Sequence, residues 1–153
     1  MNIEIPSPES VQKPATVVYA CSGCSDAGEI ADRVARQLTR DGAAQMSCLA
    51  GIGGRVKSLI SKAEKAERIL VIDGCPLNCA AHTLKLAGFH KFDHLELQKI
   101  GIRKGSCPMT DERIAAGVEA SRKILESETS STLAQKLDPL NEVPQPPVLA
   151  ELR

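Results

Sequence analysis

Aromatic residues and surplus charge are both scarce in this chain of 153 residues. The chain contains one tyrosine, two phenylalanines and no tryptophan, so its core must be aliphatic. Few rings are then available as stacking platforms for nucleotide bases. The 19 basic residues balance 19 acidic ones, whereas a nucleic-acid binder usually carries a basic surplus that pairs with phosphates. The composition therefore argues against nucleic acid as a partner.

Long apolar runs are missing as well. No segment approaches the roughly 18 apolar residues that a transmembrane helix needs. Residues 1–13 are polar and lack the basic start and apolar run of a signal peptide. We therefore expect no membrane partner and a cytoplasmic location, where thiols stay reduced. Six cysteines in such a compartment indicate metal binding or thiol chemistry rather than structural disulfides.

Composition divides the chain into three parts. Residues 1–13 read as a flexible leader, 14–127 as one cysteine-rich α/β metal-binding domain, and 128–153 as a tail rich in serine and proline. We expect the tail to pack weakly or irregularly. The alternatives are that it docks on the domain through Leu149 and Leu152, or that it binds a partner protein.

Strand and helix patterns alternate four times through the domain. Short apolar or β-branched segments predict strands at 15–20, 45–50, 68–72 and 94–98. Apolar residues at helical spacing predict helices at 27–40, 55–66, 77–87 and from Thr110 to about residue 125. The third strand is apolar on both faces, as a central strand should be, and the fourth alternates like an edge strand. The alternation predicts a three-layer, Rossmann-like α/β fold: a four-stranded, mainly parallel sheet with helices on both faces.

Local signals mark the ends of three predicted helices. Asp26 followed by Glu29 resembles a capping box at the first helix start. Gly42 and Gly88 are placed to end the first and third helices. Thr110 can cap the last helix.

Most of the cysteines fall at the ends of the predicted strands. The first strand is followed by Cys21 and Cys24, the second ends near Cys48 and a glycine-rich loop, the third is followed by Cys75 and Cys79, and Cys107 lies in the loop after the fourth. The carboxyl ends of parallel strands share one rim, where such folds bind ligands. A Cys-x-x-Cys turn before a helix can hold both thiolates on one metal.

The pair Cys75 and Cys79 has the spacing of one helical turn. With Pro76 at the first helical position, both would lie on one face of a helix start. A helix N-terminus stabilises thiolates, which are the form that binds metal. The sequence therefore favours deprotonated sulfur at this rim.

Each of these residues also has a purely structural interpretation. A single buried cysteine is commonly a small apolar residue, which is as good an interpretation for Cys48 alone and the preferred one for Cys107. Asp73 either supports a metal ligand or shapes a turn. The three histidines have no clear ligand spacing to a cysteine and read as surface or edge residues.

Three segments, in order, resemble the DGC-domain family. They are 21–23 (CSG), 48–50 (CLA) and 71–75 (VIDGC), the last followed by Cys79-Ala80. The resemblance covers about residues 15–105. Members of that family are described as candidate zinc-binding proteins with four chelating cysteines, and the family has no well-established biochemical role. The resemblance implies Cys21, Cys48, Cys75 and Cys79 as ligands, with Cys24 as an additional thiol.

The residues leave two classes of function open. The first is zinc binding or transfer without catalysis, by thiolates of the cysteines at positions 21, 24, 48, 75 and 79. Four of them would form a closed tetrahedral site, and a fifth would permit ligand exchange. The second is thiol redox chemistry, or a relay of sulfur or selenium. A further alternative is an iron–sulfur cluster, which four cysteines can also hold. No Ser-His-Asp order stands out and no carboxylate pair lies at a predicted strand end, so enzymatic activity is uncertain and the balance leans against it.

Overall fold

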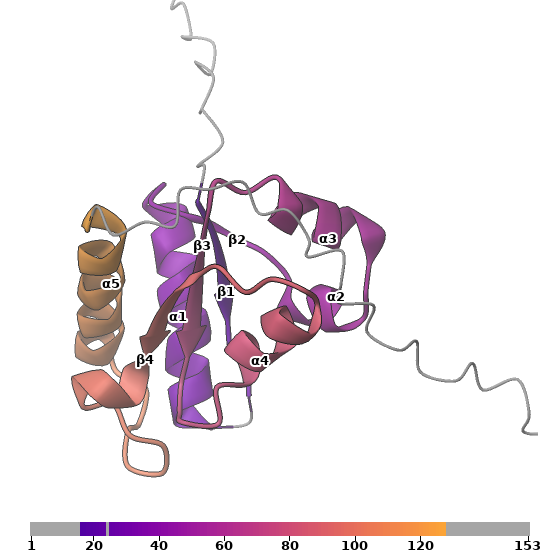
Figure 1. Cartoon of the computed structure of the whole chain (residues 1–153). Coiled ribbons are helices and arrows are strands. Elements are labelled where there is room, and N and C mark those ends of the chain that lie inside the picture. Colours follow the sequence, from indigo (N-terminus) through magenta and orange to yellow (C-terminus); the bar gives the residue numbers. More distant parts are fainter. Residues whose placement is uncertain (1–15, 24, 128–153) are drawn as a thin grey trace, which may run out of the picture.

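Four parallel β-strands form the centre of the protein (Figure 1). This computed structural model describes residues 16–23 and 25–127. The strands lie in the order β2–β1–β3–β4, with the bounds β1 Thr16–Ala20, β2 Gln45–Met46, β3 Arg68–Asp73 and β4 Asp93–Glu96. All three strand pairings are parallel. The predicted leader, the predicted tail and Cys24 lie outside the described residues.

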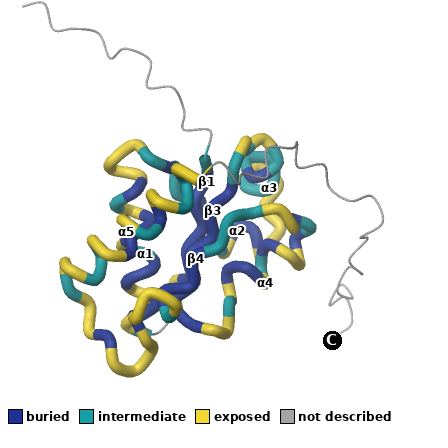
Figure 2. Tube along the Cα trace, turned by 60° about the vertical axis from the view of Figure 1, so that its left-hand side comes forward, coloured by how far each residue is buried: buried dark blue, intermediate teal, exposed yellow. Residues whose placement is uncertain are grey.

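Helices cover both faces of this sheet. One face carries α1 (Asp26–Arg40) and α5 (Asp111–Glu126), and the other carries α2 (Leu49–Gly53), α3 (Lys57–Glu64) and α4 (Cys79–Leu86). Figure 2 shows the buried strands between helices whose outer turns are exposed. The predicted three-layer α/β fold is confirmed, and the sheet is wholly parallel.

The central strand β3 explains why the sheet needs both helical layers. Leu70 and Ile72 point into the core beneath α1 and α5, whereas Ile69 and Val71 belong to the core beneath α2 and α4. Side chains alternate between the faces of a strand, so an unbroken apolar run requires an apolar partner on each side. β4 is an edge strand as predicted, but its predicted alternation through residue 98 is wrong. The strand ends at Glu96, which is buried rather than outward, and a 3-10 helix (η1, Leu97–Ile100) follows.

The second predicted strand is wrong beyond its first two residues. The pairing of β2 with β1 covers only Gln45 and Met46. The segment read as a glycine-rich loop is the short helix α2, and Cys48 is its N-cap. The Gly51 N–H donates to the Cys48 sulfur at 3.3 Å, an arrangement that ends the strand and starts the helix. Glycines in this segment hid the helix because they lower helix propensity.

Two predicted helix starts are also corrected. The side chain that caps α1 belongs to Ser25, whose oxygen accepts from Gly28 N, so the capping box at Asp26 is wrong. The helix α4 begins at Cys79 rather than at residue 77, because Asn78 has a left-handed backbone (φ 49°, ψ 43°) that no α-helix continues through. Thr110 caps α5 as predicted, with its hydroxyl accepting from Arg113 N.

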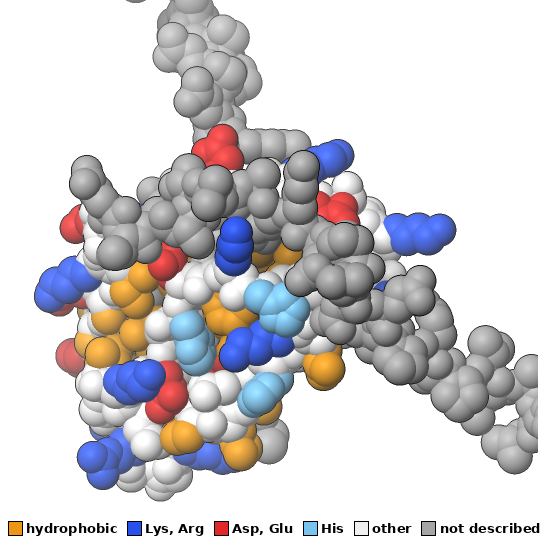
Figure 3. Space-filling view, in the orientation of Figure 1, with side chains coloured by type: hydrophobic (Ala, Val, Ile, Leu, Met, Phe, Trp, Pro, Cys, Tyr) orange, Lys and Arg blue, Asp and Glu red, His pale blue; other side chains and the backbone are white. Residues whose placement is uncertain are grey.

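The surface of the domain mixes charges of both signs. Figure 3 shows Lys and Arg side chains interspersed with Asp and Glu on one face. Within residues 16–23 and 25–127, no helix combines the length and the apolar character required to cross a bilayer.

Candidate functional site

The connections that leave β1 and β3 lead to opposite sides of the sheet, and a cysteine follows each of these two strands. From β1 the chain passes through α1 to β2 on one side, and from β3 it passes through α4 to β4 on the other. Such a divergence is the switch point at which open α/β sheets bind ligands. Cys21 follows β1 and Cys75 follows β3, and both are buried. The Cys21 N–H donates to Ile72 O at 2.8 Å, which ties the end of β1 to β3.

Burial governs the chemistry of the Cys21 thiol. It raises the pKa of Cys21 above its ordinary value of 9.0, because a thiolate loses its hydration there. Backbone hydrogen bonds from Gly74 and Gly23 lower this pKa in part, and the charges of Asp73 and Cys79 raise it further. Cys21 is therefore a neutral thiol in the metal-free protein, and it lies within electrostatic range of Cys79.

Gly74 places the loop that carries Cys75. A Cβ atom at Gly74 would lie 2.6 Å from both the carbonyl carbon and the oxygen of Ala27, in the first turn of α1. The loop after β3 thus lies against the backbone of α1, closer than any side chain would allow. This contact holds Cys75 beside the start of α1.

Asp73 fills the N-terminus of α4. Its buried carboxylate accepts from Ala80 N at 2.8 Å and from Ala81 N at 3.1 Å. His94 Nε2 lies 3.0 Å from Asp73 Oδ2, and the His94 ring packs edge-on against Phe92 with centroids 6.2 Å apart. These two amides are therefore bound to an internal carboxylate rather than to a thiolate. Asp73 has a structural role at the start of α4, and its role in supporting a metal ligand stays a prediction.

The predicted helical face shared by Cys75 and Cys79 does not exist. Cys75 is buried in the loop before α4, whereas Cys79 is the exposed first residue of the helix. Pro76 lies outside the helix and is exposed. The left-handed Asn78 separates the two thiols, so their spacing in the chain is not the spacing of a helical turn.

Cys48 occupies a different part of the same rim. It is exposed at the start of α2, beside buried Ser47. Burial raises the pKa of Tyr19, and charge on Cys48 raises it further. Neither Tyr19 Oη nor Ser47 Oγ has a hydrogen-bond partner within the described residues, and the same holds for Asn78 Oδ1. The unpaired buried polar atoms thus lie near the carboxyl ends of the strands, around the cysteines.

The five cysteines in the described part of the chain are all free thiols, and two of them belong to the hydrophobic core, on opposite faces of the sheet. Cys107 is 1% exposed and packs in the cluster beneath α1 and α5, whereas Cys21 belongs to the cluster on the opposite face of the sheet. Among residues 16–23 and 25–127, no three His, Cys, Asp or Glu side chains are placed to hold one metal ion. Cys24 lies outside the described residues.

The sequence interpretation missed the contact between Asp73 and His94. His94 was read as a surface or edge residue, and it does lie on the edge strand, only partly exposed. Its partner is 21 positions away, and they meet because β3 and β4 pair with Val71 opposite His94. The sequence alone gives no sign of this contact, which can be inferred only when the register of β3 and β4 is known.

Comparison with known proteins now decides the family. The sequence profile of the DGC domain matches residues 17–121, from β1 into α5. The chain belongs to the DGC-domain family. It is 41% identical over 95 residues to the "Anaerobic and virulence modulator AnvM" of Pseudomonas aeruginosa, a match that covers 62% of this chain and 72% of that protein. No solved structure matches the chain significantly. All five described cysteines of this DGC domain lie inside the matched region.

Proposed function

We propose that this DGC-domain protein binds a thiophilic metal ion, zinc in the first place, at the carboxyl ends of its parallel strands and without catalysis of its own. The observation that supports the proposal is the placement of Cys21 and Cys75 after the two adjacent strands of the switch point, with Cys79 opening the helix that follows β3. Thiolates are the ligands preferred by zinc and by iron–sulfur clusters.

The donor chemistry suits such a metal, while the described positions of the thiols fall short of a closed site. We propose Cys21, Cys48, Cys75 and Cys79 as ligands, with Cys24 as a fifth ligand or exchange partner. The two exposed thiols, at the starts of α2 and α4, would move toward the buried pair when the ion binds. Binding would release protons, including the one that burial holds on Cys21.

Metal analysis of freshly purified anaerobic protein, with its visible spectrum, tests this proposal. One zinc per chain and no colour support it, whereas brown protein with labile sulfide would indicate an iron–sulfur cluster instead. Cys75→Ser and Cys79→Ser should each abolish stoichiometric binding. Cys107→Ser is the matched control and should retain the metal, because this thiol is buried beneath the other face of the sheet. Full occupancy in every single serine variant would overturn the proposal.

A second candidate function is thiol-based regulation. Cys48 and Cys79 are free and exposed, and the relative from Pseudomonas aeruginosa is named as a modulator of anaerobic and virulence functions. We propose that oxidants would modify these two thiols first, because reactivity follows exposure and thiolate character. Mass spectrometry of the reduced, metal-free protein after graded peroxide treatment checks the order. Oxidation of the buried Cys21 or Cys107 before the exposed thiols would exclude this mechanism.

A further inference from the structure

A groove of about 620 Å³ runs between α1 and α5, on the helical layer far from Cys21. Its lining includes apolar side chains and arginines from both helices: Met109, Ile114, Val118, Arg33, Arg40 and Arg122. Met109 is 38% exposed, and Ile114 and Val118 are only half-buried. The apolar surface of α5 is therefore incompletely covered within the described residues.

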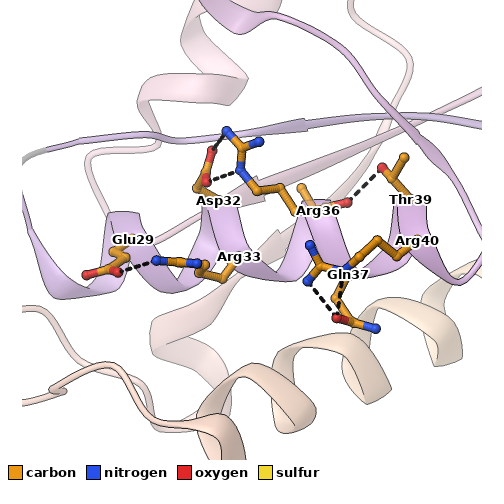
Figure 4. A network of polar contacts seen from close by, with 8 residues as sticks. Glu29, Asp32, Arg33, Arg36, Gln37, Thr39 and Arg40 are labelled. Carbon is orange, nitrogen blue, oxygen red and sulfur yellow. Dashed lines mark hydrogen bonds and ion pairs between the residues drawn. The ribbon is translucent and has the colours of Figure 1, made fainter.

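Two of the three arginines of the groove make exposed contacts along their own helix, whereas Arg122 pairs with Asp41, at the end of α1, at 2.8 Å. Arg33 pairs with Glu29 at 3.4 Å, and Arg40 donates to Gln37 at 2.6 Å, both along α1 (Figure 4). Exposed pairs of this kind contribute little stability, so an incoming carboxylate can replace the present partner at little cost. The groove thus combines apolar surface with cations that can be recruited.

We propose that residues 133–142 of this same chain occupy the groove. The segment has three leucines (Leu133, Leu137 and Leu140) and two acidic residues, Asp138 and Glu142, against one lysine. Leucines match the apolar lining, and the two carboxylates match Arg33 and Arg40, whose present contacts along α1 are exposed. Complementarity of this kind selects one partner over others.

Chain connectivity makes this occupant favourable. The segment begins six positions after Ser127, the residue that ends α5, and α5 forms one wall of the groove. A 16-residue helix is about 24 Å long at 1.5 Å per residue. About seven extended residues span that length. Because the segment is tethered, its effective concentration reaches the millimolar range, so even a weak contact would stay occupied.

Site-directed photo-cross-linking in the full chain tests the proposal. Ala115 lines the groove and is exposed, whereas its neighbour Ala116 is also exposed but does not line the groove. Each alanine is replaced separately by p-benzoylphenylalanine, and the illuminated protein is mapped by mass spectrometry. We expect Ala115→p-benzoylphenylalanine to give a monomer-mass product linked to residues 133–142, with a yield independent of protein concentration. The probe at Ala116 should not give this product.

Tail variants supply the second arm of the experiment. Leu137→Asp with Leu140→Asp should abolish the cross-link, whereas the same change at Leu149 and Leu152 should leave it intact. Circular dichroism confirms that each variant is folded, and a probe at Met109 replaces the one at Ala115 if that variant does not fold. A product of twice the mass would show a second copy in the groove and overturn the proposal. Cross-links confined to other segments, or equal at Ala115 and Ala116, would overturn it as well.

Discussion

Replacing Gly74 by alanine should disturb the contact that places the loop after β3 on α1. The added Cβ would lie 2.6 Å from two backbone atoms of Ala27, whereas ordinary contact begins at 3.4 Å. Backbone atoms of a helix cannot rotate away, so the loop or the helix must shift. Overpacking of this kind costs about 1–3 kcal/mol, and a clash with backbone belongs at the upper end. In a domain of roughly 100 residues, a loss of 2–3 kcal/mol lowers the melting temperature by about 10 °C.

Gly53→Ala is the matched control for this change. A Cβ at Gly53 would meet only Thr83 Cγ2, at an ordinary 3.5 Å, and the position is helical. Alanine there should be neutral or stabilise by about 0.5–1 kcal/mol, because glycine loses more conformational freedom on folding. The chain has no tryptophan, so urea unfolding is best followed by far-UV circular dichroism.

The comparison of the two glycine variants has a clear negative outcome. If the unfolding free energy of Gly74→Ala lies within about 0.5 kcal/mol of the parent value, the effect is no larger than that of an ordinary surface substitution. The loop and α1 could then move apart at little energetic cost, and the close contact at Gly74 would not hold them in place. An equal loss in Gly53→Ala would also refute the reasoning, because the contact at Gly74 would then not be the cause.

Three further changes probe the surroundings of the thiols. Asp73→Ala should cost about 1–3 kcal/mol for each of the Ala80 and Ala81 amides that it leaves without an acceptor, measured by urea unfolding, and Asp73→Asn should cost less. In reduced, metal-free protein, the pKa of Cys21 is raised in the folded state, so the protonated thiol contributes to the free energy of unfolding. This contribution is complete below pH 9.0 and is lost as the pH rises above that value. Cys21→Ala should flatten this alkaline fall in unfolding free energy; an unchanged slope would contradict the assignment. Cys107→Ser should lose about 1–3 kcal/mol, because its hydroxyl enters an apolar core, and a stability equal to that of the parent would show that the hydroxyl finds a partner.

The sequence predicts the fold where one interaction dominates. The apolar run at 69–72 is long enough to require two covering layers, and β3 is central as expected. Thr110 and Gly42 act locally, through a hydroxyl cap and a positive φ of 73°, so their effect does not depend on distant residues. Such signals survive in the tertiary structure because they need no partner from elsewhere in the chain.

The site was harder to predict because it depends on single backbone conformations. The left-handed Asn78 removes the helical turn that the spacing of Cys75 and Cys79 suggested. A cysteine rather than a hydroxyl or carboxyl residue caps α2, so the usual N-terminal signal was missing at Cys48. The role of Asp73 required knowledge of where α4 begins and how β4 pairs. Sequence spacing identified the rim but not the arrangement of sulfur atoms on it.

The carboxylate of Asp73 also has a consequence for which cofactors the fold can accept. Doubly wound proteins commonly hold the phosphates of nucleotides on free amides at a helix N-terminus beside the switch point. In this protein, two amides of α4 already bind an anion that the chain itself supplies. A phosphate arriving at α4 would have to displace a buried carboxylate and meet its negative charge. We therefore expect phosphorylated ligands to bind poorly at the start of α4.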